Sequence, residues 1–150
     1  MALNKGVYII AEAGVNHNGD FGRALEMITV AKSSKADAIK FQTAVPEEVA
    51  TKFAQKADYQ KEKTKNSKTQ LEMIKEIHLP LEQYKLLKKE CDSVGIEFLS
   101  SPFDLTSVNF LANLGMSKFK VPSGEITNFP YLKLIGEQRK PTILSTGMAN

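Results

Sequence analysis

The stretch VYIIAEAGVNHNG at residues 7–19 is an apolar run that ends in polar residues and glycine. Four further short apolar runs end in a similar way, and helix-like stretches follow most of them. Their endings are Lys40-Phe41-Gln42-Thr43, Ser100-Ser101-Pro102-Phe103, Lys120-Val121-Pro122-Ser123-Gly124-Glu125 and Ser145-Thr146-Gly147-Met148. This succession predicts an α/β protein of the (β/α)8 TIM-barrel type, whose chemistry sits at the carboxyl ends of the strands. Since eight strands close such a barrel, the chain of 150 residues is expected to hold the first five strands and about four helices.

Periodicity and capping residues place the elements. We expect strands at about 7–13, 38–43, 96–100, 118–122 and 142–145, each bounded by turn residues. We expect helices from Asp20 as the cap to about residue 33, from Pro80 to residue 94, from Asp104 as the cap to residue 114, and from about residue 130 to 140. An open doubly wound sheet also fits, but no Gly-x-Gly-x-x-Gly pattern follows the first strand, which weakens a dinucleotide-binding interpretation.

The segment 45–79 is too long for a simple loop between a strand and a helix. Within it, residues 70–77 are typical of a short helix, and the polar stretch 58–69 is expected to form a mobile lid. Insertions at the carboxyl face of a barrel usually shape the substrate pocket, so we expect this role here.

Composition favours a folded protein of the cytoplasm. Hydrophobic residues make up 42% of the chain and charged residues 25%, and the single Cys91 has no partner for an internal disulfide. No stretch resembles a signal peptide or a membrane span. The net charge of +3 is concentrated in residues 52–89, which hold ten Lys against five Asp or Glu. A solvated insertion explains this better than an anion-attracting rim, and no nucleic-acid motif accompanies the lysines.

Two lysines at strand ends are the first candidates for a binding site. Lys40 and Gln42 lie two residues apart and point to the same side of their strand, as Lys118 and Lys120 do on theirs. This alternation aims Lys40, Gln42 and Lys120 into the barrel mouth, where a lysine requires an anion. That anion is either a ligand phosphate or carboxylate, or Glu12 or Glu125 in a purely structural network. The repetition at two strand ends favours a ligand.

Hydroxyl groups and a carboxylate accompany these lysines at the strand ends. Ser101, Ser123 and Ser145, with backbone N–H groups near glycine, are typical of a phosphate site. Glu12 is placed to act as a general base or simply to stabilise a turn. His17 lies in a turn-like stretch, and neither it nor His78 has the neighbours of a zinc or iron site.

Taken together, these motifs resemble the sialic acid synthase family, whose members make N-acetylneuraminic, legionaminic or pseudaminic acid. The match extends over essentially the whole chain, in the order and spacing of the family. The resemblance implies a barrel that condenses phosphoenolpyruvate with an N-acetylated amino hexose such as N-acetylmannosamine. The products are a nine-carbon 2-keto sugar acid and phosphate. It also implies Mn²⁺ or Mg²⁺ as cofactor, a homodimer of the full-length enzyme, and no nucleic-acid or membrane partner.

The resemblance also assigns roles to single residues. It implies phosphoenolpyruvate contacts for five of them, Lys40, Ser101, Lys120, Ser123 and Ser145. It implies catalytic carboxylates at Glu12 and Glu125, and sugar contacts at Gln42 and Asn66, the latter in a poorly aligning insertion. The metal ligands, the remaining strands and an antifreeze-like second domain are expected beyond residue 150, with no metal ligand in this chain. We therefore expect these 150 residues alone to be inactive.

Three functional hypotheses stay open at this point. The first is the sialic-acid-type synthase, with an N,N'-diacetyllegionaminate synthase of the same family as its alternative. The second is a Schiff-base aldolase on a similar barrel, which requires one lysine with a lowered pKa. The third is a half-barrel that only binds or assembles.

Overall fold

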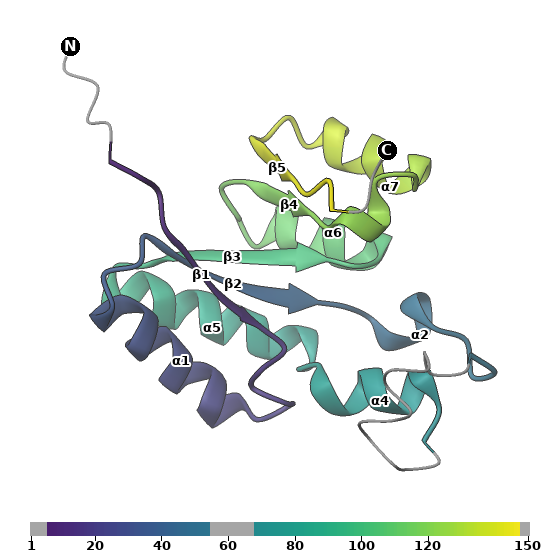
Figure 1. The fold of residues 1–150 in the computed structure, drawn as a ribbon, viewed down its shortest axis with the longest axis horizontal. Coiled ribbons are helices and arrows are strands. Elements are labelled where there is room, and N and C mark those ends of the chain that lie inside the picture. The colour runs from purple at the N-terminus through teal and green to yellow at the C-terminus, as the bar shows by residue number, and fades with distance from the viewer. Residues whose placement is uncertain (1–5, 55–67, 148–150) are drawn as a thin grey trace.

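The computed structural model describes residues 6–54 and 68–147, in which strands and helices alternate (Figure 1). The strands are β1 (Ile10–Gly14), β2 (Ala38–Thr43), β3 (Glu97–Pro102), β4 (Phe119–Val121) and β5 (Thr142–Leu144). The helices are α1 (Phe21–Ser33), α2 (Pro46–Val49), α4 (Gln70–Ile77), α5 (Leu81–Val94), α6 (Leu105–Asn113) and α7 (Phe129–Glu137), with a 3₁₀ turn at Ser123–Glu125. No helix among the described residues is both long and apolar enough to cross a membrane.

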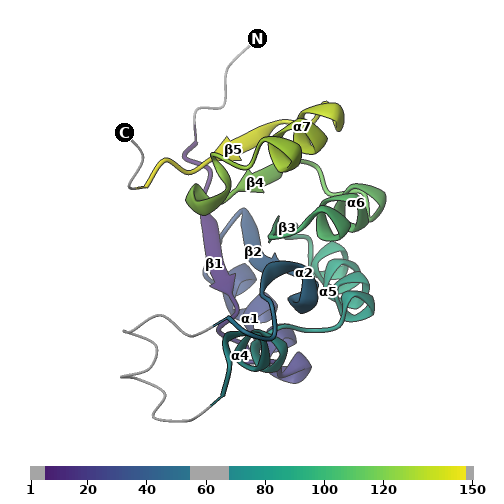
Figure 2. The ribbon, with the colours of Figure 1, turned by 90° about the vertical axis from the view of Figure 1, so that its right-hand side faces the viewer.

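All strand pairs are parallel, as the alternation of strands and helices predicts. β1, β2 and β3 form one sheet in that order, and β4 and β5 form a second. Figure 2 shows the strands following one another along an arc, with α1, α5, α6 and α7 on its outer side. This arrangement agrees with five successive units of a (β/α) barrel.

The ends of the helices follow their capping residues. The Asp20 side chain accepts a hydrogen bond from the backbone N–H of Arg23 at the start of α1, and Asp104 does the same for Ser107 at the start of α6. Gly95 ends α5 in the left-handed conformation at φ 71°. α5 begins one residue later than predicted, because Pro80 is extended and caps the helix from outside.

The hydrophobic core lies between the strands and the outer helices. On β2, Ile39 and Phe41 are fully buried against this core, whereas Lys40 and Gln42 point to the inner side of the arc. Phe119 is likewise buried on β4, next to the half-buried Lys120. The predicted alternation of the two lysine-bearing strands is therefore confirmed.

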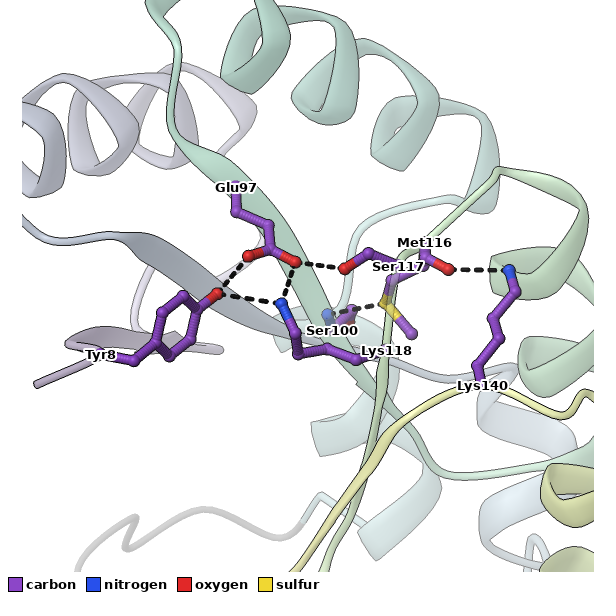
Figure 3. A network of polar contacts seen from close by, with 7 residues as sticks. All are labelled: Tyr8, Glu97, Ser100, Met116, Ser117, Lys118 and Lys140. Atoms are coloured by element: carbon purple, nitrogen blue, oxygen red, sulfur yellow. Dashed lines mark hydrogen bonds and ion pairs between the residues drawn. The ribbon is translucent and has the colours of Figure 1, made fainter. Parts of the chain in front are cut away.

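The first strand is shorter than predicted, since it starts at Ile10 rather than Val7. Val7 is 84% exposed. The Tyr8 hydroxyl donates a hydrogen bond to the Glu97 carboxylate at the start of β3. Lys118, just before β4, forms an ion pair with the same carboxylate (Figure 3). This cluster holds three chain segments together at the amino-terminal end of the strands, away from the carboxyl ends.

β3 and β4 lie side by side but belong to separate sheets. The backbone N–H of Ser100 on β3 donates to the Sδ atom of Met116 at 3.2 Å (Figure 3). In a continuous sheet, a backbone carbonyl of the neighbouring strand would accept this hydrogen bond. The Nζ atom of Lys140 donates to the carbonyl of Met116 at 2.7 Å. The Met116 side chain thus connects β3 to the segment before β4, and Lys140 connects that segment to the one before β5.

The insertion after β2 is partly as predicted. α4 has the predicted bounds, and Thr69 with Glu72 forms a capping box at its start. The short helix α2 was not predicted, so the described residues hold six α-helices: the four expected around the barrel, α4 and α2. The predicted lid at 58–69 lies outside the described residues except for its last two positions.

Candidate active site

Three neighbouring strands bring a carboxylate, a lysine and a hydroxyl together on the inner side of the arc. The Nζ atom of Lys40 lies 2.6 Å from Oε2 of Glu12 and donates to Oγ of Ser101 at 3.4 Å. Glu12 and Lys40 are direct partners in the β1–β2 ladder, which explains their contact. The Lys40 side chain is 10% exposed, whereas the Glu12 side chain is 54% exposed. Glu12 thus neutralises Lys40 from the solvent side.

A bulge in β1 sets the position of the Glu12 carboxylate. The ladder register shifts between Glu12 and Gly14, and Gly14 adopts φ 55°, a conformation that favours glycine. A Cβ atom at Gly14 would lie 3.3 Å from Oε1 of Glu12 and 3.5 Å from Nε2 of Gln42. The glycine therefore leaves room for both side chains to approach each other.

A second lysine reaches the same region from β4. The Nζ atom of Lys120 donates to Oγ of Ser145 at 2.5 Å and to the carbonyl of Val121 at 2.9 Å. Burial lowers the pKa of Lys120, and the positive charge of Lys40 lowers it further, while Glu12 opposes the shift. Two cations and one carboxylate thus influence one another, which leaves a local excess of positive charge.

Ser123 and Glu125 lie on the 3₁₀ turn that follows β4. Oγ of Ser123 lies 3.8 Å from the position that a Cβ atom of Gly147 would occupy, so the ends of β4 and β5 approach closely. Oε2 of Glu125 accepts a hydrogen bond from Nδ2 of Asn128 at 2.7 Å. The suggestion that Glu125 balances a lysine is therefore not supported by its contacts among the described residues. Asn66 lies outside the described residues.

Two buried tyrosine hydroxyls, whose role was not predicted from the sequence, donate to backbone carbonyls near the ends of β2 and β3. The Tyr84 hydroxyl on α5 donates to the carbonyl of Gln42 at 2.6 Å, and the Tyr131 hydroxyl on α7 donates to the carbonyl of Pro102 at 2.9 Å. Both tyrosines are fully buried. The apolar helix face around Tyr84 is visible in the sequence, and a tyrosine there requires a partner for its hydroxyl. The partner itself is 42 residues away in sequence.

Asp104 connects the loop after β2 to the start of α6. Its Oδ2 atom accepts hydrogen bonds from the backbone N–H of Val45 and from the Ser107 hydroxyl, both at 2.7 Å. The sequence identified Asp104 only as a helix cap. The residue also holds the end of β2 beside the end of β3.

No group of three or more His, Cys, Asp or Glu side chains suited to a metal ion occurs in residues 6–54 and 68–147. The Glu12 carboxylate forms an ion pair with Lys40, and the Glu125 carboxylate accepts a hydrogen bond from Asn128. The described residues therefore do not fit a metal centre, and the divalent metal that the resemblance implies remains a prediction. What they offer is anion binding by two lysines and several hydroxyl groups.

Comparisons with known proteins agree with this geometry. A family model described as the NeuB family matches residues 27–150. The chain is 49% identical over 143 residues to an N,N'-diacetyllegionaminic acid synthase of Legionella pneumophila, covering 95% of this chain and 40% of that protein. It is 39% identical to the human N-acetylneuraminate-9-phosphate synthase, covering 94% and 39% respectively. The crystal structure of an N-acetylneuraminic acid synthetase from Leptospira borgpetersenii superimposes with a TM-score of 0.79 at 30% identity, covering 100% of this chain and 50% of that one. The partial-barrel fold is thereby confirmed, and the chain spans about 40% of the length of these curated relatives.

Proposed function

Because this chain belongs to the NeuB family of sialic-acid-type synthases, we propose that it forms part of a synthase that condenses phosphoenolpyruvate with an N-acetylated amino hexose. The observation that carries the proposal is the convergence of Lys40 and Lys120, from two separate sheets, beside three serine hydroxyls at the strand ends. Among the residues that the structure describes, Glu12 alone contributes an opposite charge there. A ligand with a phosphate and a carboxylate satisfies the remaining positive charge.

In this proposal, the lysines and hydroxyls hold phosphoenolpyruvate with its carbon 3 facing the sugar aldehyde. Carbon 3 attacks the aldehyde carbon, and water adds at carbon 2 of the former phosphoenolpyruvate. The tetrahedral intermediate then expels phosphate by cleavage of its C–O bond, which leaves the 2-keto acid.

Glu12 is the described residue best placed to handle the water. Its carboxylate is half-exposed, contacts Lys40 and lies on the same inner side as Gln42, the proposed sugar contact. A carboxylate there orients a water molecule and accepts its proton as the C–O bond forms. The bulge at Gly14 fixes the carboxylate relative to the ligand.

The test is phosphate release by the complete product of the gene's open reading frame. Phosphoenolpyruvate, Mn²⁺ and either N-acetylmannosamine or a hexose with two acetamido groups are supplied, and the sugar acid is identified by its mass. The proposal expects release that depends on a sugar. Release with neither sugar, from a folded protein, contradicts it.

A second candidate function, the Schiff-base aldolase, draws on the lowered pKa of Lys120. Borohydride reduction in the presence of pyruvate traps such an enzyme as a covalent adduct on Lys120. The contacts of Lys120 with the Ser145 hydroxyl and a backbone carbonyl favour anion binding instead, so we expect no adduct. A trapped adduct at Lys120 moves the assignment to an aldolase.

A further inference from the structure

Three buried hydroxyl groups meet on the outer side of β2 and β3; we call Thr43, Ser100 and Tyr84 the hydroxyl network. The Thr43 and Ser100 hydroxyls lie 2.7 Å apart, and both side chains are completely buried. Thr43 shares the outer side with Phe41, which lies two residues before it and pairs with Ser100 in the ladder. The Tyr84 hydroxyl on α5 donates to the carbonyl of Gln42 at 2.6 Å. The network therefore joins β2, β3 and α5 at one level.

The hydrogen bonds of the hydroxyl network run in one direction. Burial raises the pKa of Tyr84, and hydrogen bonds from the Leu79 backbone and the Thr43 side chain oppose that rise. A hydrogen bond that lowers the pKa of a phenol is donated to its oxygen, so Thr43 is the donor to Tyr84. The Thr43 hydroxyl has a single proton, so Ser100 is the donor in the 2.7 Å bond. The series of donors thus leads from Ser100 through Thr43 and Tyr84 to the carbonyl of Gln42.

Hydroxyl groups are not needed to fill this part of the core. The two preceding positions on the outer side of β2 are Ile39 and Phe41, both buried and apolar. Val has nearly the shape of Thr and is buried without a partner, whereas a buried hydroxyl costs free energy unless it is hydrogen-bonded. What the hydroxyls add is direction, because a hydrogen bond weakens steeply as its angle departs from linearity. The network therefore restricts sliding and rotation of the two strands.

The strand positions that the network restricts carry two of the proposed ligand contacts. Gln42 and Ser101 are direct partners in the β2–β3 ladder. The network ends on the backbone carbonyl of Gln42 and begins at Ser100, the neighbour of Ser101. A shift of either strand would therefore move the proposed sugar contact relative to the proposed phosphoenolpyruvate contact.

We propose that Thr43 and Ser100 are positioning residues for the condensation. Their hydrogen bond holds Gln42 and Ser101 in the relation in which the sugar aldehyde meets carbon 3 of phosphoenolpyruvate. Both hydroxyls are buried on the outer side and act through these neighbours rather than on a substrate. Loss of the bond should therefore slow carbon–carbon bond formation more than it weakens binding of either substrate. This inference rests on the proposed synthase function and adds two residues to it.

The experiment measures kcat, both KM values and urea stability of the complete open-reading-frame product in the wild type and in variants. Thr43→Val takes the acceptor away from the buried Ser100 hydroxyl, so stability and kcat should both fall. The double variant Thr43→Val/Ser100→Ala removes both partners and should be more stable than Thr43→Val. Its kcat should nevertheless stay about tenfold below that of the wild type, the effect of one hydrogen bond, with little change in either KM.

Two further variants serve as controls. Thr43→Ser keeps the hydroxyl and should keep the kcat of the wild type. Ile28→Val removes one methyl group from a fully buried side chain on α1, outside the hydroxyl network. It should lower stability without lowering kcat.

The outcomes separate this inference from the proposed function. A double variant whose kcat returns with its stability shows that the hydroxyls serve only the fold, and this overturns the inference. An equal loss of kcat in Ile28→Val, or a loss that lies entirely in KM, also overturns it and leaves the synthase intact. Absence of phosphate release from the wild type with either sugar contradicts the synthase, and the inference is then wrong with it.

Discussion

Replacing Lys40 by Met tests the anion site most closely. The Lys40 side chain is 10% exposed, and its charge meets Glu12 at 2.6 Å and the Ser101 hydroxyl at 3.4 Å. Met keeps the length of the aliphatic stem and removes the charge. Glu12 is 54% exposed and remains hydrated in the variant, so the free energy of unfolding should change by no more than about 1 kcal/mol.

The loss of ligand binding should be much larger. Removing one charge from a desolvated pair costs about 2–5 kcal/mol, which corresponds to roughly 30- to 4,000-fold weaker binding of phosphoenolpyruvate. Lys120 is only half-buried, so Lys120→Met should fall in the lower part of this range. Calorimetric titration of the complete open-reading-frame product measures both dissociation constants directly.

Lys118 provides the matched control, since it lies two residues from Lys120, just before β4, but pairs with Glu97 at the amino-terminal end of the strands. Lys118→Met should lower stability and leave phosphoenolpyruvate affinity unchanged. If Lys40→Met and Lys120→Met both bind the ligand within twofold of the wild type, the anion site is wrongly assigned. The same conclusion follows if Lys118→Met weakens binding equally.

Three further predictions concern the scaffold. Burial opposes ionisation of Glu97, but hydrogen bonds from Lys118 and neighbouring hydroxyls outweigh it and hold the pKa below its usual value. The stability that this carboxylate provides is complete above the unfolded-state pKa of about 4.3 and is lost as the pH falls through the lower folded-state pKa. In urea titrations, the free energy of unfolding of Glu97→Gln should therefore fall less steeply than that of the wild type below about pH 4.5. Tyr84→Phe leaves the buried carbonyl of Gln42 without its donor and should lower the free energy of unfolding by about 1–3 kcal/mol, again by urea titration. Gly14→Ala forces a side chain into φ 55° against Glu12 and should cost about 1 kcal/mol of stability while lowering turnover.

Each of these has an outcome that contradicts it. Parallel pH profiles for the wild type and Glu97→Gln exclude the proposed contribution of that carboxylate. Unchanged stability of Tyr84→Phe shows that another donor, or water, satisfies the carbonyl. Full activity of Gly14→Ala shows that the bulge does not set the position of Glu12.

The elements predicted correctly are those that residues close together in the sequence determine. The bounds of β2 and α4 match the prediction, and Gly95 ends α5 as expected, because alternation, a capping box and a glycine act within a few residues. The helix α2 was missed although Pro46 opens it and two glutamates lie in its first turn, which are ordinary start signals.

The contacts within the site depend on long-range geometry. The alternation on β2 and β4 predicted which side Lys40 and Lys120 take, and the structure brings both toward Glu12. The bulge that aims Glu12 depends on how β1 pairs with β2, so it is not visible in one strand. Likewise, nothing in the stretch around His17 indicates that this turn residue is fully buried and lies 6.1 Å from the Phe41 ring.

The most direct test of the central claim uses phosphoenolpyruvate labelled with ¹⁸O in the oxygen that bridges carbon 2 and phosphorus. The complete open-reading-frame product is incubated with the labelled phosphoenolpyruvate, Mn²⁺ and the N-acetylated hexoses. The mass of the released phosphate is then determined by mass spectrometry. The account predicts labelled phosphate only when a sugar is present, because the C–O bond breaks and the bridging oxygen leaves with phosphorus. Unlabelled phosphate, or no phosphate that depends on sugar, would contradict a phosphoenolpyruvate-condensing site at these strand ends.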